Sequence, residues 1–319
     1  MYYSIRHKTR FRYSAPVRES FLEVRMQPRS EEAQRCIEFK LITTPTAHIL
    51  NYRDYLGNSV HHFDIPAPHK QLTVTAEALV EFSSPAELPI ALEPAAWDAL
   101  DTLARSAELY DFLAPSRFAS FTPLLHKLAR EIEVRRRDDP LSLLRQINSA
   151  IYKSFDYAPQ STRVDSPIDE ALQARKGVCQ DFTHIMTALV RKVGIPCRYV
   201  SGYLFHGGQN HDRSAEDATH AWVEALLPGL GWVGFDPTNN LLAGSRHIRA
   251  AVGRDYADVP PTRGVYRGDA TNTVEVGVRV SLTSAPTAPP AAEEEPELMP
   301  MGISWPSMGD ALQMQVEQQ

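Results

Sequence analysis

Hydrophobic and polar residues alternate along residues 1–82, in segments that are rich in β-branched and aromatic side chains. A period of two places successive side chains on opposite faces of a strand, and turn residues such as Leu56-Gly57-Asn58 separate the segments. We therefore expect residues 1–82 to form an all-β domain with the architecture of a small sandwich. The proline-containing segment "SSPAELPIALEP", residues 83–94, is predicted to be a linker.

The pattern changes to a helical period after residue 95, where apolar residues recur three and four positions apart. Four helices are predicted, over residues 97–107, 122–134, 140–154 and 168–175. A longer apolar stripe follows Cys179 and defines a fifth helix, which should end at Gly194 because Pro196 prevents its continuation. The stripe consists of Phe182, Ile185, Met186, Leu189, Val190 and Val193.

Strand-like alternation returns after this helix. The predicted strands are residues 197–205, 219–227, 231–236 and 273–282. We therefore expect a second domain over residues 95–283, in which helices pack on an antiparallel sheet, so that the whole chain is of the α+β class. From residue 284 the chain reads "SAPTAPPAAEEEPE", a composition that predicts a disordered tail over residues 284–319.

Composition and charge exclude several classes of function. The 319 residues carry a net charge of −6, and the basic run at 135–137 is followed at once by two aspartates, so we expect no nucleic-acid surface. No stretch approaches the ~20 apolar residues of a membrane span, and no apolar signal-peptide segment is visible. Three cysteines without a CxxC pair argue against a disulfide framework or a zinc site. A cytoplasmic protein with reduced thiols and no bound metal is expected.

The segment "KGVCQDFTHIMTALVRKVGIP", residues 176–196, places Cys179 where a loop turns into a helix. The helix dipole and the unpaired N–H groups of the first turn favour a thiolate there, and they could also bind an oxyanion. Gly177 allows the tight turn that leaves the sulfur accessible. The alternative is a cysteine that is merely tolerated at a helix end. Cys36 and Cys197 lie beside apolar strand residues and are expected to be small buried side chains.

A base for a thiolate is available on the strands that follow. Strand alternation places His220, Trp222 and Glu224 on one face, and Trp232 and Asp236 share a face of the next strand. This arrangement fits a cysteine–histidine pair whose imidazole is oriented by a carboxylate. The alternatives are a strand histidine that bonds to a neighbour, and an aspartate that only forms the turn before the next proline.

The sequence does not determine the register of this hairpin. A tight turn at residues 228–231 places His220 opposite Asn239 rather than opposite Asp236. Bringing His220 opposite Asp236 requires a longer loop or a bulge. The triad hypothesis therefore predicts that the hairpin ladder stops short of Leu226.

With these residues in view, the chain resembles the transglutaminase-like superfamily, whose core is similar to papain-type cysteine proteases, and in particular its bacterial members with a β-rich N-terminal domain. The matching stretches are "GVCQDFTHIMTALVRKVGIPCRYVSGYL", "HAWVEALLPGLGWVGFDPTNN" and "HIRAAVGRDYADVPPTRGVYRG". The resemblance implies Cys179 as nucleophile, His220 as general base and then acid, and Asp236 as the residue that orients His220. It makes residues 95–283 a transglutaminase-like catalytic domain. No calcium-binding loop is evident, so no cofactor is implied.

The remaining site residues are less well defined by the sequence. Gln173, six residues before Cys179, has the spacing of the papain-type oxyanion glutamine, and Tyr157 is a second candidate for that role. Trp222 and Tyr203 are candidates for lining the cleft, although core packing is the alternative for each.

Three functions remain open at this point. The first is a thiol hydrolase that forms a thioester with peptide or isopeptide amides of a protein or peptide substrate and passes the acyl group to water. The second is a transglutaminase that passes it to an amine. The third is a binding scaffold without catalysis. The lack of an evident acceptor motif or calcium site favours hydrolysis, and retention of all three triad residue types disfavours the scaffold.

Overall fold

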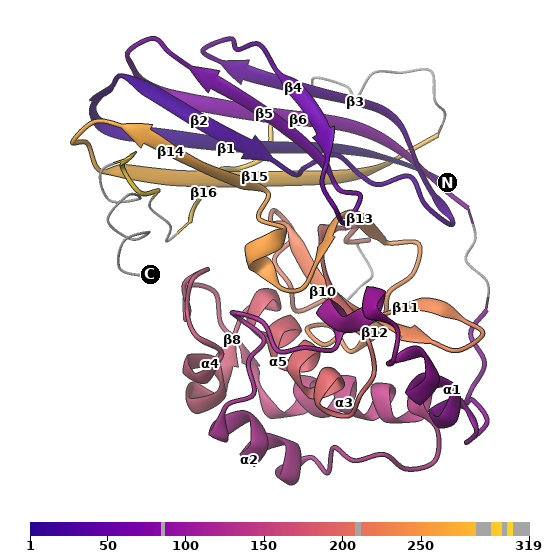
Figure 1. The fold of residues 1–319 in the computed structure, drawn as a ribbon. Coiled ribbons are helices and arrows are strands. Elements are labelled where there is room, and N and C mark those ends of the chain that lie inside the picture. The colour runs from indigo at the N-terminus through magenta and orange to yellow at the C-terminus, as the bar shows by residue number, and fades with distance from the viewer. Residues whose placement is uncertain (84–86, 208–211, 285–294, 302–304, 309–319) are drawn as a thin grey trace.

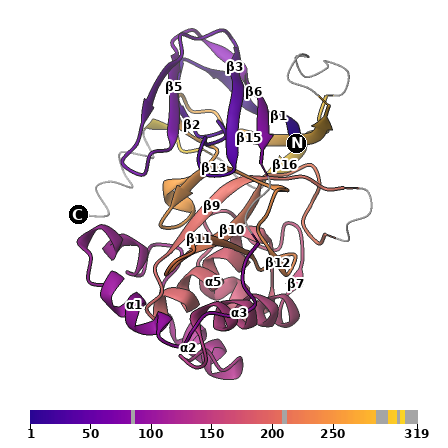
Figure 2. The ribbon, with the colours of Figure 1, turned by 90° about the vertical axis from the view of Figure 1, so that its right-hand side faces the viewer.

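The computed structural model describes residues 1–83, 87–207, 212–284, 295–301 and 305–308, which form a β-sandwich stacked on an α+β body (Figure 1). The body contains its own antiparallel sheet. Figure 2 shows this sheet between the helices on one side and the sandwich on the other. The α+β class and the β-rich N-terminal region expected from the sequence are confirmed.

The sandwich packs a five-stranded sheet, in the order β16-β15-β1-β6-β3, on a four-stranded sheet, in the order β14-β2-β5-β4. The alternation read from the sequence is visible in β1, where every second side chain from Tyr3 to Phe11 is buried. Each large apolar side chain buried in this way contributes about 1.5–3 kcal/mol. The N-terminal strands are β1 (Tyr2–Val17), β2 (Glu19–Val24), β3 (Gln34–Thr44), β4 (Leu50–Arg53), β5 (Ser59–Ile65) and β6 (His69–Phe82).

Two strands from the C-terminal part of the chain complete the sandwich. β14 (Thr262–Arg267) pairs with β2, and β15 (Asn272–Thr283) pairs with β1 along its whole length. The sequence assigns these residues to the catalytic domain, whereas the structure places them in the sandwich. Alternation identifies a strand but not its partner, so the return of the chain to the N-terminal sheets could not be read from it.

Part of the tail is also ordered on the sandwich. β16 (Met299–Met301) pairs with β15, and Trp305 lies against Phe11 with ring centroids 4.0 Å apart. The Asn272 side chain forms two hydrogen bonds with the main chain of Trp305: its amide N–H donates to the Trp305 carbonyl, and its amide oxygen accepts the Trp305 N–H. The predicted disorder is therefore wrong for residues 295–301 and 305–308, where one buried aromatic residue outweighs the average composition. Residues 285–294, 302–304 and 309–319 of the predicted tail lie outside the described residues.

The body has a five-stranded antiparallel sheet in the order β12-β11-β10-β9-β13. Strand β9, which lies between β10 and β13, is buried at every position, because α5 covers one face and the sandwich covers part of the other. Tyr203 and Ile248 of this sheet pack against Tyr3 and Ile5 of β1, which joins the two parts through a shared apolar cluster. The strands are β9 (Cys197–Leu204), β10 (His220–Leu227), β11 (Gly231–Asp236), β12 (Leu241–Leu242) and β13 (His247–Gly253).

The helices follow the predicted pattern closely. They are α1 (Ala96–Leu103), α2 (Pro123–Glu131), α3 (Pro140–Ser154), α4 (Ile168–Ala174) and α5 (Cys179–Lys192), with 3-10 turns η1 (Ala107–Phe112) and η2 (Tyr256–Asp258). The first helix is shorter than predicted and ends before η1. The parallel pair β7 (Asp156–Tyr157) and β8 (Lys176–Gly177) precedes α5. Within the described ranges, no helix combines the length and the apolar character needed to cross a membrane.

Candidate active site

Cys179 is the first residue of α5, as the sequence predicts. Asp181, two residues later, accepts the Val178 N–H at 2.8 Å and the Thr162 hydroxyl at 2.6 Å, which fixes the turn into the helix. A side chain at Gly177 would place its Cβ 2.8 Å from the Asp181 side chain, so this close approach needs glycine. The first N–H groups of a helix have no partner within the helix, and Cys179 belongs to this first turn.

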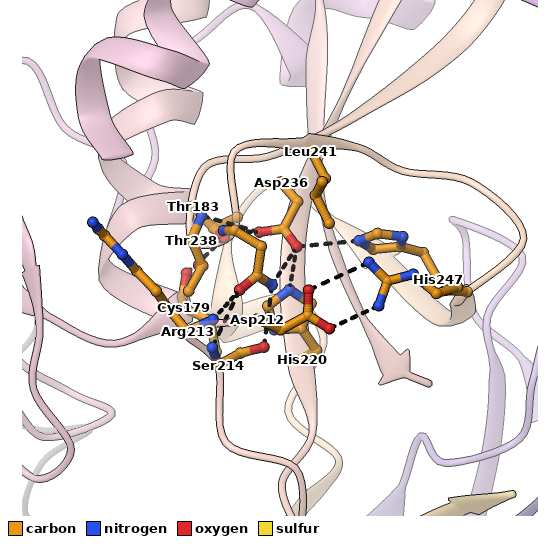
Figure 3. Close-up of polar contacts among 12 residues, drawn as sticks. Cys179, Thr183, Asp212, Arg213, Ser214, His220, Asp236, Thr238, Leu241 and His247 are labelled. Carbon is orange, nitrogen blue, oxygen red and sulfur yellow. Dashed lines mark hydrogen bonds and ion pairs between the residues drawn. The ribbon is translucent and has the colours of Figure 1, made fainter. Parts of the chain in front are cut away.

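His220 and Asp236 meet at the opposite end of the hairpin from its turn. His220 begins β10 and Asp236 ends β11, and the histidine Nε2 lies 2.8 Å from the carboxylate Oδ2 (Figure 3). Both side chains are buried, with 3% and 0% of their surfaces exposed. The second carboxylate oxygen of Asp236 accepts the backbone N–H groups of Thr238 and Asn239 at 3.0 and 3.2 Å. The carboxylate is therefore held in one orientation toward the imidazole.

The hairpin register differs from the one that the triad hypothesis predicts. The ladder runs through Leu226 to Leu227, which pairs with Gly231, so the predicted early stop is wrong. Continuing this register places Asp236 opposite Trp222, and His220 is then its diagonal neighbour. Side chains of diagonal neighbours on one face can still reach each other, since their Cα atoms are only ~7–8 Å apart. The pair thus forms without any loop or bulge in the ladder.

The charge of Asp236 decides the protonation of His220. Burial alone would lower the pKa of His220, but the Asp236 carboxylate raises it to about 10, with a further contribution from Cys179. The pKa of Asp236 is held well below its usual range by His220 and His247, against the effect of burial. Nδ1 of His220 is buried and has no hydrogen-bond partner in the described part of the chain, so it is the nitrogen left for the Cys179 sulfur.

The second acidic residue on this face has another role. Glu224 is fully buried and bonds Arg198 at 2.8 Å, and it also forms an ion pair with Arg249. These two cations lower the pKa of Glu224 despite its burial. Glu224 therefore belongs to an ion-pair network with the two arginines, and Asp236 is the acid that faces His220.

Two residues beside Asp236 were not among the predicted site residues. The His247 Nε2 lies 3.1 Å from Asp236 Oδ2, and the Asn239 side-chain amide donates to the same oxygen at 2.8 Å. His247 begins the third stretch of the family resemblance, but its distance from Asp236 depends on how β13 pairs with β9. The sequence places Asn239 three residues after Asp236, within reach of a turn. Either contact becomes evident only from the fold.

The two histidines and the carboxylate also form a set of metal-type donors. One atom from each of His220, Asp236 and His247 lies within 4.8 Å of the others. The hydrogen bonds from both histidines to Asp236 account for this arrangement without an ion, and all three side chains are buried. We therefore assign the cluster to hydrogen bonding.

The two oxyanion candidates lie in different surroundings. Tyr157 is on β7, beside Gly177 of β8, and its hydroxyl oxygen accepts the Ala215 N–H at 3.2 Å. Burial and the nearby Cys179 raise the pKa of Tyr157 to about 12, which places its hydroxyl in the electrostatic range of the thiol. Gln173 is exposed on α4. Tyr157 is therefore the candidate that the fold brings toward Cys179.

The two aromatic cleft candidates are in packed interiors. Trp222 is fully buried, and the space it occupies requires Gly202, where a Cβ would lie 2.7 Å from its ring. Its ring stacks on His220 at 6.1 Å. The Tyr203 hydroxyl lies 3.2 Å from the His7 ring and donates to the Met26 carbonyl, so it joins the sandwich to the body. Their contacts are those of core residues.

The three thiols differ in their surroundings. Burial raises the pKa of both Cys36 and Cys197 to about 11. Cys197 is buried as predicted, whereas Cys36 is only half-buried on β3. Cys179 is half-buried and lies at the helix N-terminus, beside His220. It is the thiol with a base beside it.

A cavity of about 1130 Å³ opens between the sandwich and the body next to this site. Thr219, which precedes His220, lines it, and so does Tyr256, which packs in the same small apolar cluster as Cys179. Much of the remaining lining is apolar and comes from both parts of the molecule, including Phe118, Val276 and Trp305. Such a volume admits several residues of a peptide chain.

Two family models match the chain over most of these elements. Residues 3–81 match the bacterial transglutaminase-like N-terminal region, and residues 126–237, which include the cysteine, the histidine and the aspartate of the site, match the transglutaminase-like superfamily. The chain belongs to the transglutaminase-like superfamily. The first model covers the N-terminal strands of the sandwich, β1 to β6, which β14, β15 and β16 complete.

The chain is also similar to three proteins, two of which it matches over nearly their whole length. An uncharacterized protein of Mycobacterium leprae is 34% identical over 282 residues, which are 86% of this chain and 96% of the relative. An uncharacterized protein of Mycobacterium tuberculosis is 36% identical over 294 residues, covering 87% and 92%. A protein-glutamine gamma-glutamyltransferase of Pseudomonas aeruginosa is 30% identical over 137 residues, but these are only 40% of this chain and 20% of that protein.

A solved structure shows the same fold over nearly the whole chain. The crystal structure described as "a Putative Cysteine Protease from Cytophaga hutchinsonii" superposes with a TM-score of 0.70. It is 22% identical in sequence and covers 91% of this chain and 93% of its own. The sandwich and the body therefore recur together in that protein.

Proposed function

We propose that this protein is a cysteine-dependent amide hydrolase in which Cys179, His220 and Asp236 form the catalytic triad. The observation that carries the proposal is the buried His220–Asp236 pair, joined at 2.8 Å, with the second nitrogen of His220 left for the cysteine at the start of α5. Together the three side chains supply a nucleophile, a proton carrier and the group that orients it. Membership of the transglutaminase-like superfamily supports the same assignment.

The reaction would proceed in two steps. The Cys179 thiolate attacks the carbonyl carbon of an amide, and the C–N bond breaks as the His220 imidazolium gives its proton to the leaving nitrogen. The product is a thioester on Cys179. Water then attacks the thioester while His220 takes its proton, the C–S bond breaks, and the thiolate and a carboxylic acid are formed.

The negative oxygen of each tetrahedral intermediate needs donors near Cys179. The backbone N–H groups at the start of α5 are one source, because they have no partner within the helix. The Tyr157 hydroxyl is the second donor that we propose. Its oxygen already accepts the Ala215 N–H, so its single proton remains for donation to the oxyanion.

The cavity beside the site supports a peptide or protein substrate. Residues of both the sandwich and the body line it, and its walls are largely apolar. The sandwich would then be part of the substrate-binding surface rather than a separate module. The cytoplasmic location and the protein or peptide substrate stay predictions.

Amine transfer is the second candidate, and the partial match to a protein-glutamine gamma-glutamyltransferase favours it. The two activities share the thioester and differ in whether water or an amine removes the acyl group. Incubating the protein with glutamine-containing peptides, with and without a primary amine, separates them by product mass. Hydrolysis gives the carboxylic acid in both mixtures, whereas a transferase gives the amide of the added amine.

The matched control for these assays is the cysteine on the sandwich. Cys179→Ala should abolish both products, whereas Cys36→Ala, which removes a half-buried thiol of β3, should leave them unchanged. A Cys179→Ala protein that retains its full activity would reject the triad, whereas a wild-type protein that forms neither product would support the scaffold alternative.

A further inference from the structure

His247 is a buried histidine that the triad does not explain. It begins β13 and has 3% of its surface exposed. Its Nδ1 accepts the Gly244 N–H at 3.3 Å, and its Nε2 lies 3.1 Å from Asp236 Oδ2. A backbone N–H can only donate, so Nδ1 carries no proton and the hydrogen of the neutral ring is on Nε2. The local structure thereby makes His247 a donor to Asp236.

The two histidines that share this carboxylate oxygen differ in charge. Burial lowers the pKa of His247, and the charges of His220 and Arg246 lower it further, although Asp236 acts in the opposite direction. The two imidazole rings lie with centroids 6.0 Å apart, so two cations there would repel each other. The aspartate thus holds one imidazolium, His220, and one neutral imidazole, His247.

Asp236 is held from several directions. Oδ2 accepts from His220, His247 and the Asn239 amide, and Oδ1 accepts the two backbone N–H groups of the following turn. In Figure 3, His247 and Cys179 lie on opposite sides of Asp236. The His247 N–H therefore holds the Asp236 carboxylate from the side that faces away from the Cys179 sulfur. Without it, this buried oxygen would lose one of its three side-chain donors.

We propose that His247 is a positioning residue for the acyl-transfer reaction, which as a neutral imidazole donates its Nε2–H to Asp236 and so keeps the carboxylate aimed at His220. The inference rests on the proposed function of the triad. It adds a fourth side chain to the three of the triad. This side chain belongs to β13, so the pairing of β13 with β9 determines where its donor lies. The competing explanation is packing alone, because the His247 ring also meets Trp222 edge-on at 5.2 Å.

Two substitutions separate donation from packing. His247→Phe keeps a flat ring of similar size but removes the donor, whereas His247→Gln can keep an N–H near the position of Nε2. We expect His247→Phe to slow alkylation of Cys179 by iodoacetamide at pH 6 at least about tenfold, the change that loss of one hydrogen bond to a charged group produces. His247→Gln should stay within about threefold of the wild type. Equal rates in the two variants, whether both fast or both slow, would overturn the proposal.

The wild-type and His220→Ala proteins distinguish failure of this inference from failure of the triad. If Cys179 alkylation at pH 6 does not depend on His220, the proposed function itself fails. If it depends on His220 but not on the donor at residue 247, only the role of His247 fails.

Nitrogen NMR of the wild-type protein tests the same inference if His247→Phe does not fold. With 15N-labelled histidine, two-bond proton–nitrogen spectra report which ring nitrogen is protonated, and the signal of His247 is identified as the one missing in His247→Gln. We expect the neutral Nε2–H form of His247 at pH 7 and above. A neutral Nδ1–H form, or an imidazolium at pH 7, would overturn the assignment.

Discussion

His7 in the sandwich and His220 in the body are buried to nearly the same extent, with 1% and 3% of their surfaces exposed, yet their pKa values move in opposite directions. The neighbours of His7 are the hydroxyl groups of Thr9 and Tyr203, which carry no charge, and burial lowers its pKa to about 3. His220 has Asp236 at 2.8 Å, and its pKa is raised to about 10. Both histidines are buried, so the charge of Asp236 beside His220 decides which of the two can carry a proton.

Replacing the carboxylate should make His220 resemble His7, and this is the largest effect that we expect. Asp236→Asn keeps the size of the side chain but removes the charge, so the imidazolium loses the group that stabilises it. We expect amide hydrolysis to fall by roughly 10³–10⁴-fold, the scale of this change in other triads. The measurement is the turnover rate on the glutamine-peptide mixture described above. A loss below about tenfold would contradict the role of Asp236.

The next comparison is between two tyrosines. The Tyr157 hydroxyl lies near the Cys179 sulfur, and the Tyr203 hydroxyl lies between the sandwich and the body. Tyr157→Phe removes the proposed oxyanion donor and should lower turnover about 10²-fold with little change in KM. Tyr203→Phe removes a buried hydroxyl that bonds His7 and Met26, and should lower stability without a comparable loss of turnover. Equal effects of the two substitutions on turnover would reject the assignment of Tyr157.

The opposite pKa shifts also predict opposite pH dependences of stability. Between pH 3 and 6.5 the unfolded chain binds a proton at His7 that the folded protein does not bind, so this histidine makes the free energy of unfolding rise with pH. Between pH 6.5 and 10 the folded protein binds a proton at His220 that the unfolded chain has lost, so this histidine makes stability fall with pH. Each slope approaches about 1.4 kcal/mol per pH unit.

Urea unfolding between pH 5 and 9 measures both slopes. His7→Gln should reduce the loss of stability toward pH 5, and His220→Gln should reduce the loss toward pH 9. His62→Gln, at the exposed neighbour of His61 on β5, is the control and should change neither limb. Slopes that are the same in all three variants would show that the two histidines do not titrate as the structure indicates.

The sequence was sufficient for the local features of the site and insufficient for those that depend on pairing. The stripe from Phe182 to Val193 predicts α5 and so places Cys179 at its start, because helical periodicity is a property of neighbouring residues. Alternation likewise placed His220 and Asp236 on strands. It could not distinguish a direct from a diagonal pair, so the predicted interruption of the hairpin was wrong although the two side chains meet.

The same limit explains what the sequence left out of the fold. The pairing of β15 with β1 joins residues more than 250 positions apart, and no local pattern encodes it. His247 reaches Asp236 only because β13 pairs with β9, on the far side of β9 from β10. Trp305 was assigned to a disordered tail because composition averages over many residues, whereas its contact with Phe11 depends on one.

The central claim is that Cys179 and His220 act as a thiolate–imidazolium pair, and alkylation of the three cysteines measured across pH 5–9 tests it most directly. Peptide mass spectrometry would give the rate of iodoacetamide modification at Cys179, Cys36 and Cys197 in the wild type and in His220→Ala. We predict that Cys179 reacts rapidly near pH 6, where the raised pKa values of the other two thiols keep them unreactive, and that His220→Ala removes this difference. A Cys179 that is unreactive at pH 6, or that reacts with the same pH profile without His220, would contradict the account.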